Sequence, residues 1–177
     1  MNPTGIAAAV LAAAPGALYV ASLGTPTSAL RAASDDGPHL YMGGSMGTAL
    51  AAALGVADKR PERAVVALLG DGETLMGASA LWSLAGLAPR NLLAVVLVDG
   101  HYTITGGQPL GVPDAFGAVA AALGLATATA RSAGRASERT CATISACVRA
   151  AAVASPSAAA TEPKAAGTPS GCPPVIV

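Results

Sequence analysis

The chain has 177 residues, enough for one domain with a sizeable hydrophobic core. Ten basic and ten acidic residues give no net charge, and only 11% of the residues are charged, which argues against binding to nucleic acids or to anionic membranes. No apolar run reaches the length of a membrane span without Gly, Pro or a charged residue. Because charge is so sparse, we expect another chain to cover much of the surface.

The three cysteines, Cys141, Cys147 and Cys172, have neither the spacing of a metal site nor the even number of a disulfide set. They are typical of inert thiols in a reducing compartment, and we expect a cytoplasmic protein. The apolar stretch at 6–14 is similar to the middle of a signal peptide, but no basic residue precedes it. A first domain helix is therefore the preferred interpretation.

The first sixty residues alternate between apolar segments and breaks that contain Gly or Pro. They predict a helix, a strand and two further helices, at 6–14, 17–22, 25–33 and 45–57. Pro15-Gly16 ends the first helix, and Ser45 is expected to cap the last one. A loop is expected at 34–38.

Two continuous apolar runs, 64–69 and 93–98, flank a helical pattern at 78–87 that ends before Pro89. Runs without polar alternation are typical of strands buried on both faces of a parallel sheet. This part of the chain therefore predicts a strand-helix-strand unit.

The remaining segments continue the alternation, with a loop at 106–113, a helix at 114–123, a fourth strand at 125–130 and a helix at 135–153. Alternating strands and helices predict an α/β fold, a three-layer doubly wound sandwich with a mainly parallel central sheet. We expect the domain to span residues 1–153. The tail, 154–177, is typical of a linker, and an edge strand at 158–165 stays open because Pro163 limits its pairing.

An acidic residue follows each of the two central strands. Asp71 lies between Gly70 and Gly72, just after the first run, and Asp99 follows the second run directly. Carboxyl ends of parallel strands meet at one edge of the sheet, where ligands of such folds bind, so both carboxylates are expected there. Two oxygen ligands beside a glycine turn suit a Mg²⁺ ion that carries a diphosphate.

Further motifs surround this pair. They are Tyr41-Met42-Gly43-Gly44-Ser45-Met46-Gly47, Gly70-Asp71-Gly72-Glu73, Asn91-Leu92, the run from Val95 to Asp99, Tyr102 and Thr105-Gly106-Gly107-Gln108. Together they resemble the diphosphate-binding domain of thiamine diphosphate enzymes, above all the sulfopyruvate and phosphonopyruvate decarboxylases. The resemblance covers roughly residues 16–130.

The resemblance implies thiamine diphosphate and Mg²⁺ as cofactors, with Asp71 as the first metal ligand. Asp99 stands where the family normally has Asn, so it adds a negative charge beside an anionic diphosphate. His101 is implied as a metal ligand through its backbone carbonyl, with a catalytic imidazole as the alternative. Gly70 and Gly72 are expected to let the backbone approach the phosphates.

The upstream loop is implied to hold the pyrimidine of the cofactor. Gly44 would offer its carbonyl to the exocyclic amine, and Met46 would act as the catalytic wedge beneath the bent cofactor. Plain packing is the alternative for Met46, since a flexible Met fills core gaps well. Ser45 is expected to contact phosphate, and Tyr102 to belong to the loop over the diphosphate and the substrate mouth.

Three other side chains are weaker candidates. Glu73 is included among the cofactor-binding residues, but a cap on the N–H groups of the next helix is its preferred role. Thr25 and His39 lie at expected strand ends. A structural role is preferred for His39.

One group required by the family is missing. This group is a glutamate that contacts the pyrimidine of the cofactor. None of the four glutamates of this chain has the sequence context that the family shows around it; they are Glu62, Glu73, Glu138 and Glu162. The resemblance therefore implies half an active site, completed by an α-type subunit with a pyrimidine domain. Homodimers of the isolated chain stay open.

The implied activity is decarboxylation of a 2-oxo acid by the β-type subunit of a sulfopyruvate or phosphonopyruvate decarboxylase. Two alternatives remain. One is another split thiamine enzyme, of the acetolactate synthase-like or benzoylformate decarboxylase-like kind. The other is a non-catalytic remnant that only binds a partner.

Overall fold

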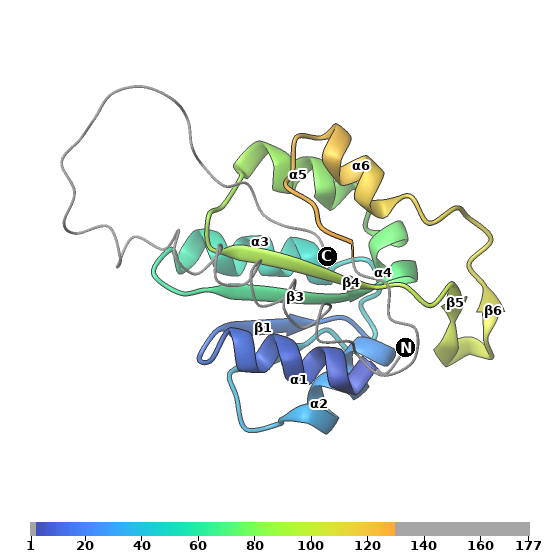
Figure 1. Ribbon diagram of the computed structural model, residues 1–177, viewed down its shortest axis with the longest axis horizontal. Coiled ribbons are helices and arrows are strands. Elements are labelled where there is room, and N and C mark those ends of the chain that lie inside the picture. Colours follow the sequence, from blue (N-terminus) through green and yellow to red (C-terminus); the bar gives the residue numbers. More distant parts are fainter. Residues whose placement is uncertain (1–2, 130–177) are drawn as a thin grey trace.

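The computed structural model describes residues 3–129. Helices and strands alternate along this part of the chain, as Figure 1 shows. The elements are α1 (Pro3–Ala13), β1 (Leu18–Ala21), α2 (Thr25–Ala33), β2 (His39–Tyr41), α3 (Ala49–Lys59), β3 (Val65–Gly70), α4 (Asp71–Met76), α5 (Ser79–Leu87), β4 (Leu92–Leu97), β5 (His101–Tyr102), the 3-10 turn η1 (Thr103–Thr105), β6 (Gln108–Pro109) and α6 (Phe116–Ala122). None of these helices is long and apolar enough to cross a membrane.

Four parallel strands form the central sheet, in the order β2-β1-β3-β4. The register places Leu68 of β3 between Ala21 of β1 and Val95 of β4. All four strands therefore end at one edge of the sheet. Residues of β3 and β4 are buried almost throughout, because helices cover the apolar side chains on both faces.

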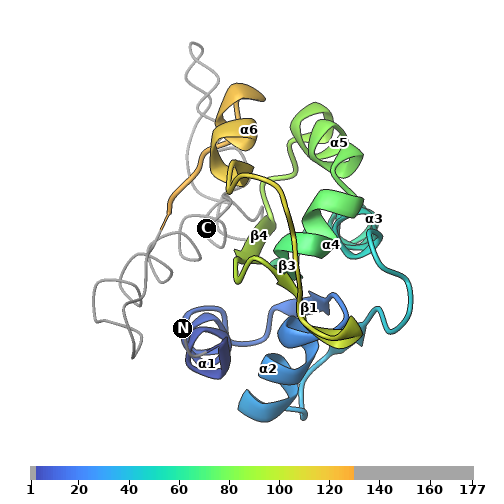
Figure 2. The ribbon, with the colours of Figure 1, turned by 90° about the vertical axis from the view of Figure 1, so that its right-hand side faces the viewer.

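Helices lie on both faces of the sheet. Figures 1 and 2 show α1 and α2 on one side, and α3, α5 and α6 on the other. On the first side Val10 and Leu30 belong to one hydrophobic cluster with Val66, and on the second side Leu84 belongs to another with Leu69. The α/β fold with a parallel sheet between helical layers is thus confirmed.

The helix expected at 45–57 begins later, at Ala49, and the prediction that Ser45 caps it is wrong. Gly47 has a φ angle of 87°, and the carbonyl of Ser45 accepts a hydrogen bond from the Thr48 hydroxyl at 2.6 Å. Ser45 therefore closes a turn ahead of the helix, and its side chain does not bind the first N–H groups of α3.

The helical pattern at 78–87 corresponds to α5, but a further short helix, α4, begins directly at Asp71. Gly77 separates the two helices. A Cβ atom on Gly77 would overlap the carbonyl oxygen of Gly47. The chain therefore needs a glycine where α4 passes the loop before α3.

The strand expected at 125–130 is not found in its described part, 125–129, where Thr127 is a single bridge residue. Leu125 and Ala126 still pack on opposite faces of the sheet. Alanine is depleted in strands, and up to residue 129 Thr127 stays a single bridge.

Of the other elements expected in the second half of the chain, some are confirmed and some lie outside the described residues. The helix at 114–123 is confirmed as α6, and the expected loop at 106–113 contains β6, which pairs with β5 in an antiparallel hairpin. The helix at 135–153, the tail and its open edge strand lie outside the described residues.

Strand β2, for which the sequence analysis gave no range, begins at His39 and is held at the edge of the sheet by aromatic contacts. The His39 ring lies edge-on to Tyr19 and Tyr41, with centroids 5.3 and 6.1 Å away. The Tyr41 hydroxyl donates a hydrogen bond to Asp35 at 2.7 Å, which lowers the pKa of that carboxyl. These contacts fix the strand that leads into the loop at 42–48.

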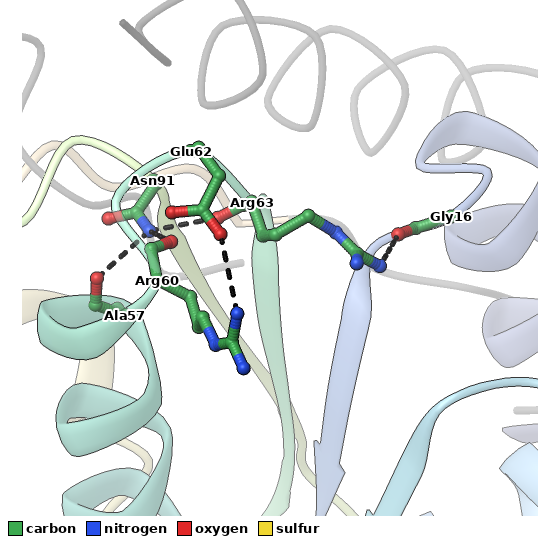
Figure 3. A network of polar contacts seen from close by, with 6 residues as sticks. All are labelled: Gly16, Ala57, Arg60, Glu62, Arg63 and Asn91. Atoms are coloured by element: carbon green, nitrogen blue, oxygen red, sulfur yellow. Dashed lines mark hydrogen bonds and ion pairs between the residues drawn. The ribbon is translucent and has the colours of Figure 1, made fainter.

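Asn91 ties together the opposite end of the sheet, as Figure 3 shows. Its side-chain amide donates to the carbonyl oxygens of Ala57, Arg60 and Arg63 at 3.1, 3.0 and 2.8 Å. Only 4% of the residue is exposed, so these bonds replace water. Asn91, one of the residues behind the family resemblance, thus holds the end of α3 against the start of β4.

Candidate functional site

A cleft of about 110 Å³ opens at the carboxyl edge of the sheet, the edge that faces the viewer in Figure 2. Four parts of the chain line it: the turn at 23–26, Met46, the end of β3 with the start of α4 at 70–73, and the segment from Leu97 through the hairpin to Thr105. This is the edge at which the sequence predicts a ligand.

Asp71 lines the cleft and is only 3% exposed. Its Oδ1 accepts a hydrogen bond from the Gly72 N–H at 2.7 Å, and its Oδ2 accepts from the N–H groups of Asp99 and Gly100 at 3.1 and 2.6 Å. The carboxylate therefore joins the end of β3 to the end of β4. Charge-assisted bonds of this kind keep an ionised acid stable away from water.

Asp99 and His101 form a closed turn beside Asp71. The Asp99 Oδ1 accepts a hydrogen bond from the His101 backbone N–H at 3.0 Å. The His101 Nδ1 lies 2.8 Å from the carbonyl oxygen of Asp99, a distance that favours the tautomer with a proton on Nδ1. Both residues are exposed and line the cleft, and their predicted roles as metal ligands stay predictions.

The two carboxylates fit a hard cation whose other ligands are water or phosphate oxygens. Within residues 3–129, no group of three or more His, Cys, Asp or Glu side chains is arranged to hold a metal ion. Asp71 and Asp99 would supply two oxygens. Mg²⁺ commonly takes one or two carboxylates and fills its shell with phosphate oxygens and water. The site therefore suits Mg²⁺ bound together with a diphosphate.

Replacing Asp99 with Asn is expected to leave Mg²⁺-dependent binding of thiamine diphosphate within about tenfold of the wild type, or to tighten it. The amide keeps an oxygen for the cation and for the His101 N–H, and it removes one negative charge near the diphosphate. Isothermal titration calorimetry measures the change, with Asp114→Asn, at another exposed acid, as the control. A larger loss would show that the Asp99 charge itself is needed.

Met46 and Tyr102 converge over Gly72. A Cβ atom on Gly72 would lie 2.6 Å from the Tyr102 ring and 3.3 Å from the methyl group of Met46. Any side chain at position 72 would displace them. Two of the predicted cofactor residues, one from each side of the cleft, thus meet at the glycine that follows Asp71.

The glycines of the motif keep their N–H groups within the protein. Gly70 donates to the Ser22 hydroxyl at 3.2 Å and accepts at its carbonyl from the Thr74 hydroxyl at 2.8 Å. Gly72 donates to Asp71, as described above. Their direct approach to phosphate stays a prediction.

Glu73 caps a helix, but not the one expected. Its Oε2 accepts a hydrogen bond from the Gly47 N–H at 2.6 Å, and its Oε1 accepts from the Ala49 N–H at 2.9 Å. These groups lie at the start of α3, which precedes Glu73 in the chain, so the predicted cap on the next helix is wrong. The residue is 5% exposed, and its contact with the cofactor stays a prediction.

Gly44 and Ser45 are not brought into the cleft lining of the described structure. Both are exposed, and Gly44 has a φ angle of 85°, which favours glycine. Their predicted contacts with the cofactor therefore concern the open side of the loop rather than the cleft.

The sequence analysis missed most of the turn after β1. Leu23, Gly24 and Pro26 line the cleft beside Thr25, whose hydroxyl lies 3.3 Å from that of Thr103 in η1. One signal was available, because the apolar run of the first strand also ends at the sheet edge where ligands bind. Thr103 and Ile104 could be placed only once the hairpin was known.

Comparison with known proteins agrees with this geometry. The model of the family described as thiamine pyrophosphate enzyme, C-terminal TPP binding domain, matches residues 24–151. The chain is 42% identical over 91 residues to a sulfopyruvate decarboxylase subunit beta from Methanothermobacter thermautotrophicus, which covers 51% of this chain and 49% of that protein. It is 40% identical over 94 residues to a phosphonopyruvate decarboxylase from Streptomyces hygroscopicus. This match covers 53% of this chain and 23% of that protein.

A solved structure supports the fold. A putative thiamin diphosphate-dependent enzyme from Mycobacterium smegmatis superimposes with a TM-score of 0.68 at 22% identity, over 99% of this chain and 31% of that one. The chain thus spans about half of the archaeal subunit and a smaller part of the longer proteins.

Proposed function

The chain belongs to the thiamine pyrophosphate enzymes with a C-terminal TPP-binding domain, and we propose that it is the diphosphate-binding subunit of a 2-oxo acid decarboxylase. The proposed substrates are of the sulfopyruvate or phosphonopyruvate type, as in the names of its relatives. The observation that carries the proposal is one cleft lined by Met46 and by Asp71 and Asp99, which follow the neighbouring strands β3 and β4.

Thiamine diphosphate, when bound, supplies the electron sink that a 2-oxo acid needs to lose CO₂. In our proposal Asp71 and Asp99 hold Mg²⁺, together with the backbone carbonyl of His101. The loop at 44–46 holds the pyrimidine side, through the Gly44 carbonyl and the Met46 side chain. Tyr102, half-buried above Gly72, keeps water from the reacting atoms.

We propose that a partner supplies the activating glutamate, because neither glutamate within residues 3–129 is placed for that role. Glu73 has both carboxylate oxygens bound to backbone N–H groups. Glu62 follows α3 near the opposite end of the sheet, where Asn91 lies (Figure 3). We therefore propose a pyrimidine-side subunit as partner, which agrees with the name subunit beta of the archaeal relative.

The surface of α4 and α5 suits this partner. No charged residue occurs from position 74 to 89, and Met76, Trp82 and Leu87 are 60, 58 and 63% exposed. The surface adjoins the cofactor loop, because Met76 packs against Gly47. Large apolar side chains without neighbouring charge are typical of the core of a protein interface.

Trp82→Glu is expected to weaken association with the pyrimidine-side subunit by at least about tenfold, because it places a charge in the centre of this apolar surface. Sedimentation velocity of the mixed subunits measures the association. Leu40→Glu, at a 45% exposed apolar residue of edge strand β2, is the matched control. Equal association of both variants would show that the partner binds elsewhere.

Product analysis tests the proposed reaction. The assembled subunits are incubated with a panel of 2-oxo acids, Mg²⁺ and thiamine diphosphate, and CO₂ and aldehyde are expected from an acid with a second anionic group. Carboligation products would favour the acetolactate synthase-like alternative. An assembly that binds the cofactor but turns over none of the acids would favour the non-catalytic alternative.

A further inference from the structure

Helix α4 carries two buried carboxylates that hold two different loops. Asp71 accepts hydrogen bonds from the N–H groups of Asp99 and Gly100, after β4. Glu73, two residues later, accepts from those of Gly47 and Ala49, before and at the start of α3. One six-residue helix therefore contacts both the proposed metal side and the proposed pyrimidine side of the cleft.

The contacts of Glu73 lie directly next to Met46. Its bond to Gly47 fixes the residue after Met46, and its bond to Ala49 fixes the first residue of α3. Gly77, which follows α4 directly, packs against the Gly47 backbone so closely that a Cβ atom would not fit. The loop is thus held by a residue of α4 and by the residue that ends it, while the Met46 methyl group lies near Gly72.

This arrangement is stronger than an ordinary helix cap. Both oxygens of an acid that is 5% exposed each receive a backbone N–H, and a negative charge is favoured at the start of an 11-residue helix. Loss of one acceptor would leave a buried N–H group without its partner. The loop would then gain freedom at the position from which Met46 projects.

We propose that Glu73 is a positioning residue that acts through Met46: by holding the N–H groups of Gly47 and Ala49 it fixes Met46 in the cleft. This role rests on the proposed function, because it needs Met46 to act on bound thiamine diphosphate. The positioning role does not require Glu73 itself to touch substrate or cofactor.

Glu73→Gln tests the proposal with little change of shape, and Glu62→Gln makes the same chemical change at a side chain that is 54% exposed. Hydrogen exchange of the chain without cofactor is measured first. The amides at 47 and 49 are expected to exchange about tenfold faster in Glu73→Gln than in the control. Unchanged exchange would overturn the proposal.

Kinetics and calorimetry of the assembled enzyme then separate positioning from simple stability. In Glu73→Gln, kcat is expected to fall about tenfold or more, while KM and the affinity for thiamine diphosphate change less than about threefold. Gly77→Ala, which pushes the same loop from the residue after α4, is expected to lower kcat in the same way. Normal kcat in both variants, despite faster exchange, would overturn the positioning role alone. A wild-type assembly that binds no thiamine diphosphate would instead overturn the proposed function, and this role with it.

Discussion

Asp71→Ala is expected to weaken Mg²⁺-dependent binding of thiamine diphosphate by more than about 100-fold. The substitution removes a proposed direct metal ligand and leaves the diphosphate charge without its cation. It also removes the acceptor of three backbone N–H groups, those of Gly72, Asp99 and Gly100. The turn after β4, which carries Asp99, would lose its anchor at the same time.

Calorimetry measures this loss, and a second variant separates ligand loss from unfolding. Asp71→Asn keeps the shape of the side chain and one of its oxygens, so the variant should stay folded. It should still bind thiamine diphosphate far more weakly than the wild type, because the negative charge at the proposed metal ligand is lost. Thermal melting of both variants checks the fold, and for Asp71→Ala a loss of about 2–4 kcal/mol in the free energy of unfolding is expected. Wild-type affinity in either variant would remove Asp71 from the metal site.

Met46→Ala is expected to lower kcat by about 100-fold while the affinity for thiamine diphosphate changes less than about tenfold. The side chains of Met46 and Tyr102 both lie over Gly72, where Met46 is proposed to support bound thiamine diphosphate. An interaction of that kind contributes mainly in the transition state, so its loss affects turnover rather than binding.

Met46→Leu is the matched variant, since it keeps an apolar side chain of similar volume. It should retain most of the turnover. Steady-state kinetics of the assembled enzyme gives kcat, and calorimetry gives the affinity. If Met46→Ala lowers affinity and leaves kcat intact, Met46 is a packing residue and the catalytic assignment is wrong.

The central part of the fold could be predicted from the sequence because its signals are local. Continuous apolar runs gave β3 and β4, and the residue after each run gave Asp71 and Asp99. The carboxyl-edge rule then placed both acids in one cleft without any knowledge of the other strands.

Other features depend on contacts between distant parts of the chain and left no such signal. β2 has three residues and is held by aromatic rings from β1 and from β2 itself, so it has no periodicity of its own. Glu73 accepts N–H groups 26 and 24 residues away, which sequence spacing does not reveal. Ser45 is a residue type that often caps helices, but here it lies in a turn between Gly44 and Gly47, which both have positive φ angles.

The hypothesis that this chain holds only half of an active site also rests on contacts within the described residues. The two glutamates that the structure describes, Glu62 and Glu73, are engaged in contacts with Arg60 and with backbone N–H groups. Neither lies free above the cleft. Within residues 3–129, the lack of a glutamate free to face the cleft and the uncharged surface of α4 and α5 support the proposed second chain.

The most direct test is the rate of 2-oxo acid decarboxylation by this chain, measured alone and after addition of a pyrimidine-side subunit, with Mg²⁺ and thiamine diphosphate present in both. We expect no detectable turnover by the chain alone and steady release of CO₂ after the partner is added, lost again when the partner's activating glutamate is replaced. Robust decarboxylation by the purified chain alone would contradict the account, because a complete active site would then have to lie within this chain.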